Sequence, residues 1–198
     1  MDAAGWAGAH VAGNSPGGWL ALELAARGRA RSVTAVAPAG LWESGTAADD
    51  VRRKFRSFCR VAPAMRFAAH PAVPDMARRA LLRWFAHRPS NVSPQLAAVT
   101  IEAPAHCRCF DSVANDSDTT AVDAMRRVEV PANVLFCGRD RVIPPARYGR
   151  RIVAKMPAIA SKTLPWVGRV PMLEAPVLIA GEIREFVDSA YGRTVRSA

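Results

Sequence analysis

A serine flanked by glycines stands where a short apolar run passes into a helical pattern. Ser15 is the centre of a G-x-S-x-G pattern at residues 13–17, which follows the apolar run 9–13 and begins the helical pattern 16–26. A strand-to-helix turn of this kind presents its serine out above a sheet, beside the positive end of the helix dipole. We expect glycine two positions before and after the serine because side chains there would collide in so tight a bend. The pattern also occurs in ordinary loops, so its context must decide whether Ser15 is a nucleophile.

A second candidate is Asp140, which follows the apolar run 132–137. A carboxylate just beyond a strand can orient a catalytic base, or it can simply begin a turn. Further apolar runs at 32–37 and 161–164 also have the length of strands. The order strand, helix, strand indicates parallel strands joined by crossover helices, so the chain is expected to be an α/β protein.

The segment 43–129 differs from the rest because helical patterns follow one another without strand-like alternation. They begin near Asp49, Asp75 and Pro94, and the last is expected to end before Pro104. This segment is therefore predicted to be a helical insertion. Elsewhere we expect the end of a helix at residues 1–8 and helices at 146–156 and 176–191.

The charge balance raises the question of nucleic acid. The chain has 198 residues, enough for one sizeable core, and a net charge of +10 from 27 Lys and Arg against 17 Asp and Glu. The arginines are scattered, the only lysines are Lys54, Lys155 and Lys162, and no basic stripe interleaved with aromatic residues is present. We therefore expect no nucleic-acid partner.

The cysteines and the N-terminal residues exclude other classes. Cys59, Cys107, Cys109 and Cys137 do not form a disulfide framework in a chain of this size. His106 with the two neighbouring cysteines could ligate a metal, but no second pair stands at zinc spacing, so no metal and no cofactor are expected. Without a signal peptide or a membrane span, a cytoplasmic location and no membrane partner are expected.

These motifs together closely resemble the C-terminal two-thirds of an α/β-hydrolase with a helical cap. The resemblance implies a partial α/β-hydrolase fold, with the N-terminal half of the sheet missing. It divides the chain into a nucleophile-elbow part (1–42), a cap (43–130) and the C-terminal part of the α/β core (131–198). Ser15 matches the family's nucleophile and Asp140 matches its triad acid. The implied chemistry is hydrolysis of an ester, an amide or a related acyl bond, with Ser15 attacking.

Three departures from the family pattern argue against activity. Arg169, just before Val170 and Pro171, stands where the family places its histidine, and a guanidinium has no lone pair to accept a proton. Pro16 lacks the backbone N–H that this position donates to the oxyanion. The family's strands before the elbow are absent, which would expose the edge of the elbow strand.

We therefore predict little or no hydrolysis by this chain. His10, His70, His87 and His106 cannot be assigned to the missing role from the sequence, so residual activity through another histidine or a partner chain stays open. The alternative is a non-catalytic module. It would bind a small apolar ester-like ligand or a partner chain that covers the exposed sheet edge. A basic surface protein for nucleic acid ranks lowest.

Overall fold

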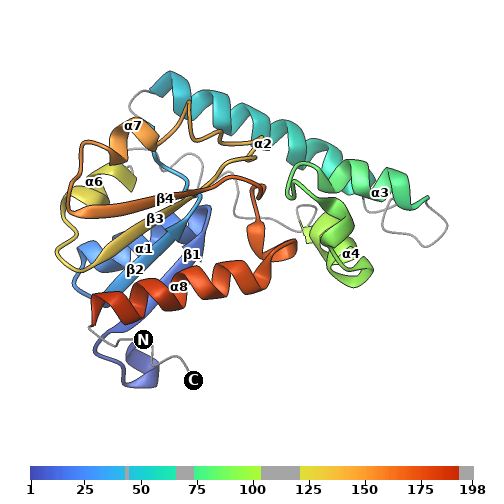
Figure 1. The fold of residues 1–198 in the computed structure, drawn as a ribbon. Helices are drawn as coiled ribbons and strands as arrows, with labels where there is room; N and C mark the ends of the chain where they lie inside the picture. The colour runs from blue at the N-terminus through green and yellow to red at the C-terminus, as the bar shows by residue number, and fades with distance from the viewer. Residues whose placement is uncertain (43–44, 66–73, 104–120, 192–198) are drawn as a thin grey trace.

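The centre of the molecule is a parallel four-stranded sheet in the order β1-β2-β3-β4. The computed structural model describes residues 1–42, 45–65, 74–103 and 121–191 (Figure 1). The strands are β1 (Ala9–Asn14), β2 (Ala30–Val36), β3 (Ala132–Cys137) and β4 (Ile159–Leu164). All six residues of β3 are buried, as expected for a strand with neighbours on both sides. The prediction of parallel strands in a partial α/β-hydrolase fold is confirmed.

Helices cover both faces of the sheet (Figure 1). On one face, α1 (Pro16–Ala26) and α6 (Ala121–Arg126) pack against Val33 and Val134 through Leu22 and other small apolar side chains. On the other face, α8 (Pro176–Ala190) packs Ile179 against a cluster that includes Val36 and Leu135. Because side chains alternate along β2, its consecutive residues supply both clusters. The sheet is therefore held between two apolar clusters, one on each face.

The helices α2, α3 and α4 lie beside the sheet, beyond the carboxyl ends of its strands (Figure 1). Their bounds are Gly45–Met65, Asp75–Leu82 and Pro94–Glu102. Val51 of α2 is buried in a cluster with Val142 and Ile143, which follow Asp140. The Tyr148 hydroxyl donates a 2.8 Å hydrogen bond to the Asp50 carboxylate, so α2 is also tied to this loop by a polar contact. The division at residues 42 and 130 stays a prediction.

Several elements differ from the expectation. The helix expected at 146–156 is only α7 (Arg150–Val153), because Gly149 has a φ of 89°, which interrupts a right-handed helix immediately before it. The helix α6 was not anticipated. Residues 2–4 form a single 3-10 turn that ends at Gly5, whose φ is 68°. Two further 3-10 turns lie at Pro89–Asn91 and Pro171–Leu173.

Strand β1 lies at the edge of the sheet. It pairs with β2 from Ala9 to Asn14, and within the described residues no strand pairs with its other side. Nearby in the sequence, Trp6 and Leu20 are 60% and 63% exposed. Single apolar residues of this size are common on protein surfaces. The free edge of β1 is a separate feature, because it offers unpaired backbone N–H and C=O groups. None of the helices in the described part of the chain is long and apolar enough to cross a bilayer.

Candidate functional site

Ser15 occupies a strained turn between β1 and α1. Its φ is 58° and its ψ is −119°, a backbone conformation that residues other than glycine rarely adopt. Gly13 makes the turn possible, because a Cβ there would lie 2.1 Å from the Gly17 carbonyl oxygen. The expectation for the second glycine was wrong, since a Cβ on Gly17 would meet no atom within 4 Å. The turn therefore depends on one glycine for space, not on two.

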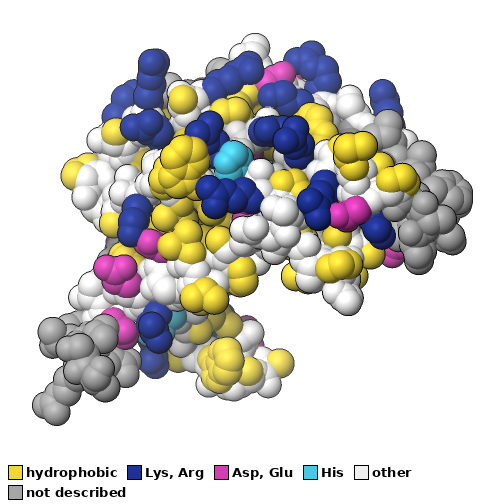
Figure 2. All heavy atoms as spheres, turned by 45° about the vertical axis from the view of Figure 1, so that its right-hand side comes forward, with side chains coloured by type: hydrophobic (Ala, Val, Ile, Leu, Met, Phe, Trp, Pro, Cys, Tyr) yellow, Lys and Arg dark blue, Asp and Glu magenta, His cyan; other side chains and the backbone are white. Residues whose placement is uncertain are grey.

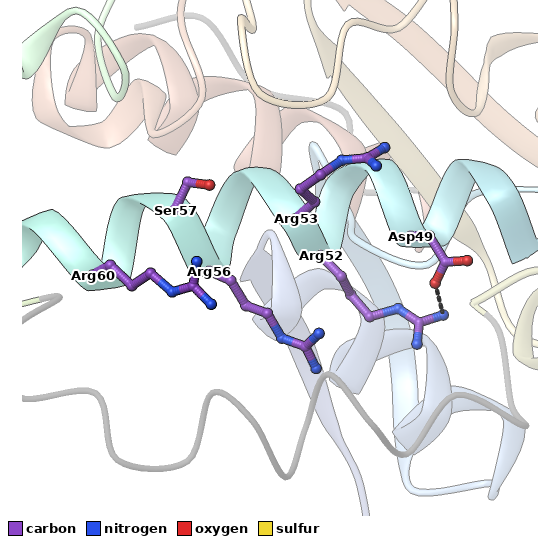
Figure 3. Close-up of a pocket in the computed structure, with 6 residues that line it drawn as sticks. All are labelled: Asp49, Arg52, Arg53, Arg56, Ser57 and Arg60. Carbon is purple, nitrogen blue, oxygen red and sulfur yellow. Dashed lines mark ion pairs between the residues drawn. The ribbon is translucent and has the colours of Figure 1, made fainter.

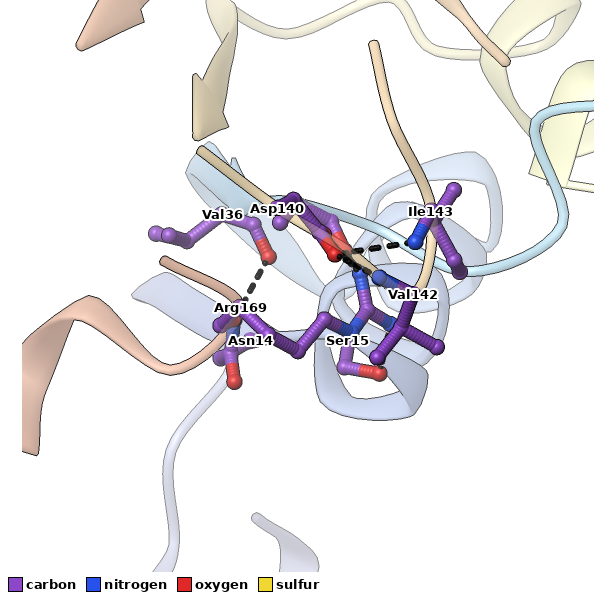
Figure 4. Close-up of polar contacts among 8 residues, drawn as sticks. Asn14, Ser15, Val36, Asp140, Val142, Ile143 and Arg169 are labelled. Atoms are coloured by element: carbon purple, nitrogen blue, oxygen red, sulfur yellow. Dashed lines mark hydrogen bonds and ion pairs between the residues drawn. The ribbon is translucent and has the colours of Figure 1, made fainter. Parts of the chain in front are cut away.

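Backbone hydrogen bonds hold this turn in place. The Ser15 N–H donates to the Val36 carbonyl (2.9 Å), and the Ala39 N–H donates to the Ser15 carbonyl (3.0 Å). The Asn14 side-chain amide donates at 3.1 Å to two carbonyls, those of Val36 and Arg169 (Figure 4). Pro16, the first residue of α1, does not prevent the elbow geometry although residues before proline favour extended backbone. Strain of order 1–3 kcal/mol persists here because the surroundings determine the backbone.

Arg169 links the serine to the aspartate. Its Nη2 donates a hydrogen bond to Ser15 Oγ, and its Nη1 lies 2.9 Å from Asp140 Oδ2 (Figure 4). The same Nη1 donates to the Ala37 carbonyl at 2.8 Å. The residues predicted from the sequence at 15, 140 and 169 are therefore brought together, although 154 positions separate the first from the last. The guanidinium spans the gap that a proton-relaying imidazole would have to occupy.

The array is buried and its carboxylate is fully paired. Asp140 is 4% exposed and Arg169 is 3% exposed. Asp140 Oδ1 accepts hydrogen bonds from the backbone N–H groups of Val142 and Ile143, both at 2.8 Å. A buried ion pair of this kind is retained only when hydrogen bonds satisfy its remaining polar atoms. Arg169 Nε is the exception, since it is buried without a hydrogen-bond partner among the described residues.

Among the described residues, the group that contacts Ser15 Oγ is the Arg169 guanidinium, which donates hydrogen bonds and cannot accept a proton. Ser15 is 8% exposed, so the residue is buried although its backbone forms the expected elbow. A cavity lined by Asp140, Tyr148, Arg169 and neighbouring apolar residues has a volume of about 10 Å³, which is room for about one water molecule. Cys137 also lines it, and burial raises the pKa of this thiol to about 12, so it is not a reactive thiolate.

The described histidines do not contact Ser15. His10 lies five residues before Ser15 along β1, and so roughly 16 Å from it. Its Nδ1 lies 2.9 Å from Ser32 Oγ, and its ring packs edge-on against Tyr191. The His87 ring stacks on Trp166 at 6.3 Å between centroids. His70 and His106 lie outside the described residues, as do Cys107 and Cys109. No three His, Cys, Asp or Glu side chains gather as a metal site in the part of the chain that the structure describes.

Glu174 is the residue that the sequence did not reveal. Its buried carboxylate accepts backbone hydrogen bonds from Gly168 (2.6 Å), His87 (3.0 Å) and Arg88 (2.5 Å). A Cβ on Gly168 would lie 2.6 Å from the His87 nitrogen, so glycine allows the two segments to approach. The loop that carries Arg169 is therefore fixed to the segment after α3. A lone glutamate near two prolines gave no signal of this role.

The strained elbow at the end of a parallel strand, with an aspartate beyond a later strand, defines an α/β-hydrolase scaffold. No protein-family model matches the sequence. The sequence is 34% identical over 192 residues to epoxide hydrolase EphH of Mycobacterium tuberculosis, across 95% of this chain and 90% of that protein. The chain belongs to the α/β-hydrolase superfamily.

Solved structures agree on the fold. A serine hydrolase from Cycloclasticus zankles superposes with a TM-score of 0.67 at 18% identity, over 95% of this chain and 66% of that one. The enol-lactonase of Burkholderia xenovorans gives a TM-score of 0.63 at 18% identity, over 94% and 68%. E-2-(acetamidomethylene)succinate hydrolase gives 0.65 at 17% identity, over 94% and 69%. The chain thus spans about two thirds of each of these structures.

Proposed function

We propose that this chain is a non-hydrolysing member of its superfamily, in which Arg169 holds Ser15 in place of activating it. One observation carries the proposal: the guanidinium bonds to Ser15 Oγ and to the Asp140 carboxylate at once. In an active triad, the group between these two residues accepts the serine proton and returns it to the leaving group. A guanidinium stays protonated at physiological pH and offers only donors.

The expected loss of rate is large. Removing the base from a serine triad lowers kcat on the order of a million-fold, and an unactivated serine is a weak nucleophile. Pro16 removes one oxyanion donor, which by itself is worth about 3 kcal/mol of transition-state stabilisation. These losses are not additive; loss of the base accounts for most of the expected fall in rate, and the lost donor lowers what remains by up to about a thousandfold.

The relative from Mycobacterium tuberculosis is named an epoxide hydrolase, so epoxides must be considered beside esters. Opening an epoxide with Ser15 would also need an acceptor for the hydroxyl proton and a donor for the ring oxygen. Arg169 cannot accept a proton, and its Nη atoms already donate to Ser15, Ala37 and Asp140. The proposal of inactivity therefore covers both substrate classes.

Turnover assays on the purified chain test this proposal. We expect the rates with p-nitrophenyl butyrate and with styrene oxide to equal those of the Ser15→Ala variant, because the serine contributes nothing. Ser93→Ala is a matched control, since it removes a hydroxyl that caps α4 and lies outside the site. Turnover by the unaltered chain that the Ser93→Ala variant retains and the Ser15→Ala variant loses would refute the proposal.

A second candidate function is that of a module that binds a partner chain along β1. The free edge of β1 and the exposed Trp6 favour it, since both offer contacts that the described residues do not use. A small apolar ester-like ligand is less favoured, because the cavity lined by Asp140 and Arg169 has a volume of only about 10 Å³. Light scattering on the purified chain, with and without Trp6→Arg, tests whether the partner is a second copy.

A cytoplasmic location remains part of the proposal and fits the free thiol of Cys137.

A further inference from the structure

The loop after β3 faces two parts of the molecule at once. Asp140 lies at its start and contacts Arg169, whereas Tyr148 lies further along and contacts α2. Between them, the backbone N–H groups of Val142 and Ile143 each donate a 2.8 Å hydrogen bond to Asp140 Oδ1. The side chains of the same two residues pack in a buried cluster with α2. The loop therefore connects α2 to the buried ion pair.

Asp50 is the polar anchor of this loop on α2. Its carboxylate accepts a 2.8 Å hydrogen bond from the hydroxyl of Tyr148, a residue that is 2% exposed. This hydrogen bond and the neighbouring cations lower the pKa of Asp50 to about 2, so the carboxylate is charged at neutral pH. Burial and the bond to Asp50 raise the pKa of Tyr148, so its hydroxyl keeps the proton that it donates. A hydrogen bond to a charged acceptor is about twice as strong as one between neutral groups.

The adjacent carboxylate of α2 differs from Asp50. Asp49 forms a 3.2 Å ion pair with Arg52 of the same helix, and its side chain is 65% exposed, against 19% for Asp50 (Figure 3). Figure 2 shows Lys and Arg side chains spread over one face of the molecule with few acidic ones among them, in keeping with the net charge of +10. Ion pairs with basic groups are therefore common to both aspartates. The bond to the buried Tyr148 hydroxyl distinguishes Asp50.

Little space separates this loop from Arg169. Ile143 and Tyr148 line the same small cavity as Asp140 and Arg169, and its volume is about 10 Å³. Close-packed interiors transmit the displacement of one side chain to its neighbours. A shift of Tyr148 is therefore expected to move the groups that bond to Asp140.

The two N–H groups of the loop determine how Arg169 meets the carboxylate. A guanidinium commonly binds a carboxylate with two parallel hydrogen bonds, one to each oxygen. In this chain Nη1 contacts Asp140 at Oδ2, while Nη2 bonds to Ser15 Oγ. Asp140 Oδ1 already accepts two backbone hydrogen bonds, so it does not compete for Nη2. If those N–H groups moved away, Oδ1 would be left as a buried charge and would draw Nη2 from Ser15.

We propose that Asp50 is a positioning residue for the contact between Arg169 and Ser15. It holds Tyr148, the loop then keeps its two N–H groups on Asp140 Oδ1, and Arg169 Nη2 stays available to Ser15. This role rests on the proposed function and deepens it, because it concerns the contact that occupies the place of the triad base. A residue of α2 thus acts on Ser15 through the loop after β3.

A double-mutant cycle on the full chain tests this coupling. Ser15→Ala removes the hydroxyl that Arg169 binds, and we expect it to raise the equilibrium constant for urea unfolding about tenfold. In a Tyr148→Phe background the same change should raise it less than about threefold, because the contact is already weakened. In a Tyr191→Phe background it should again raise it about tenfold. Tyr191 is a matched control, since its hydroxyl donates a 2.7 Å hydrogen bond to the Arg31 carbonyl.

The nitrogen-15 NMR signals of the Arg169 guanidinium give a second readout, which a general loss of stability would not move. Tyr148→Phe and Asp50→Asn should each shift these signals, because Nη2 changes its partner. Asp49→Asn removes the neighbouring carboxylate of the same helix and should leave the signals in place.

Two results would overturn the inference, and either one is sufficient. One is an equal effect of Ser15→Ala in the unaltered, Tyr148→Phe and Tyr191→Phe backgrounds. The other is a set of guanidinium signals that neither Tyr148→Phe nor Asp50→Asn shifts. Neither experiment measures turnover, so hydrolysis by Ser15 would refute the proposed function separately.

Discussion

Arg169 and the arginines of α2 show how differently the same side chain acts in two regions of one molecule. Arg169 is 3% exposed and bonds to Ser15, Ala37 and Asp140, which lie on three separate segments. On α2, Arg52 and Arg53 are more exposed than Arg169 and form ion pairs with Asp49 and Asp50. Buried and paired, a guanidinium fixes a structure. Near the surface, a guanidinium paired with a carboxylate of its own helix contributes little to stability.

The comparison predicts that replacing Arg169 costs more stability than replacing an arginine of α2. Arg169→Met should lower the free energy of unfolding by about 3–5 kcal/mol, because Asp140 is left as a buried charge without its partner. Urea unfolding followed by tryptophan fluorescence measures this. The double variant Arg169→Met with Asp140→Leu removes both charges and should recover most of the loss. A loss below about 1 kcal/mol in the single variant would contradict the account of Arg169 as a structural link.

Glu174 tests whether a buried carboxylate can hold a loop without a cationic partner. Glu174→Ala should cost about 2–3 kcal/mol, because the N–H groups of Gly168, His87 and Arg88 lose their acceptor. Glu174→Gln keeps one acceptor oxygen and should recover part of this. Near-UV circular dichroism should change as well, since Trp166 stacks on His87. If alanine and glutamine had equal and small effects, the carboxylate would not hold this loop.

Asp50 lies on α2 and contacts Tyr148 and Arg147 in the loop after Asp140. Its pKa is lowered to about 2 from 3.8, so its contribution to stability is present above about pH 4 and is lost as the pH falls through 2. Asp50→Asn should therefore lower the thermal midpoint at pH 7 and have a smaller effect at pH 2.5. Thermal unfolding of the unaltered chain and of the Asp50→Asn variant, measured from pH 7 to pH 2.5, gives the difference between their midpoints at each pH. A difference that does not shrink in acid would show that the charge of Asp50 is not what stabilises this contact.

The smallest change in the free energy of unfolding is expected for Arg60, an exposed residue of α2. Arg60→Gln should raise the free energy of unfolding by a few tenths of a kcal/mol, about 0.2–0.5, because it removes one like-charge pair with Arg56. Raising the salt concentration should reduce this gain, since salt screens exposed charges. Urea unfolding at low and high salt measures both values. A clear loss of stability would mean that Arg60 supports the fold in the way that Arg169 does.

The sequence was sufficient where a local pattern determines the structure. The elbow at Ser15 follows from the glycine pattern and from the change of period after β1, and the structure links Asp140 to Ser15 through Arg169. The position of Arg169 was predicted by resemblance, but its bonds were not, because they join three distant segments. The hydrogen bonds of Glu174 escaped for the same reason. The expected helix at 146–156 was wrong because the positive φ of Gly149 outweighs the helical pattern after it.

The packing of α2 was also beyond the sequence. Which face of this helix packs on the core depends on Val142 and Ile143, far along the chain, and the hydrogen bond from Tyr148 to Asp50 spans 98 positions.

The central claim is that Arg169 replaces the proton acceptor and so leaves Ser15 unreactive. Intact-mass spectrometry after incubation with a fluorophosphonate probe tests it most directly, because the probe adds covalently only to an activated serine. We expect the mass of the unaltered chain to remain unchanged, as in the Ser15→Ala variant. A stoichiometric adduct that maps to Ser15 and is absent from the Ser15→Ala variant would contradict the claim. It would show that another group in the chain accepts the proton.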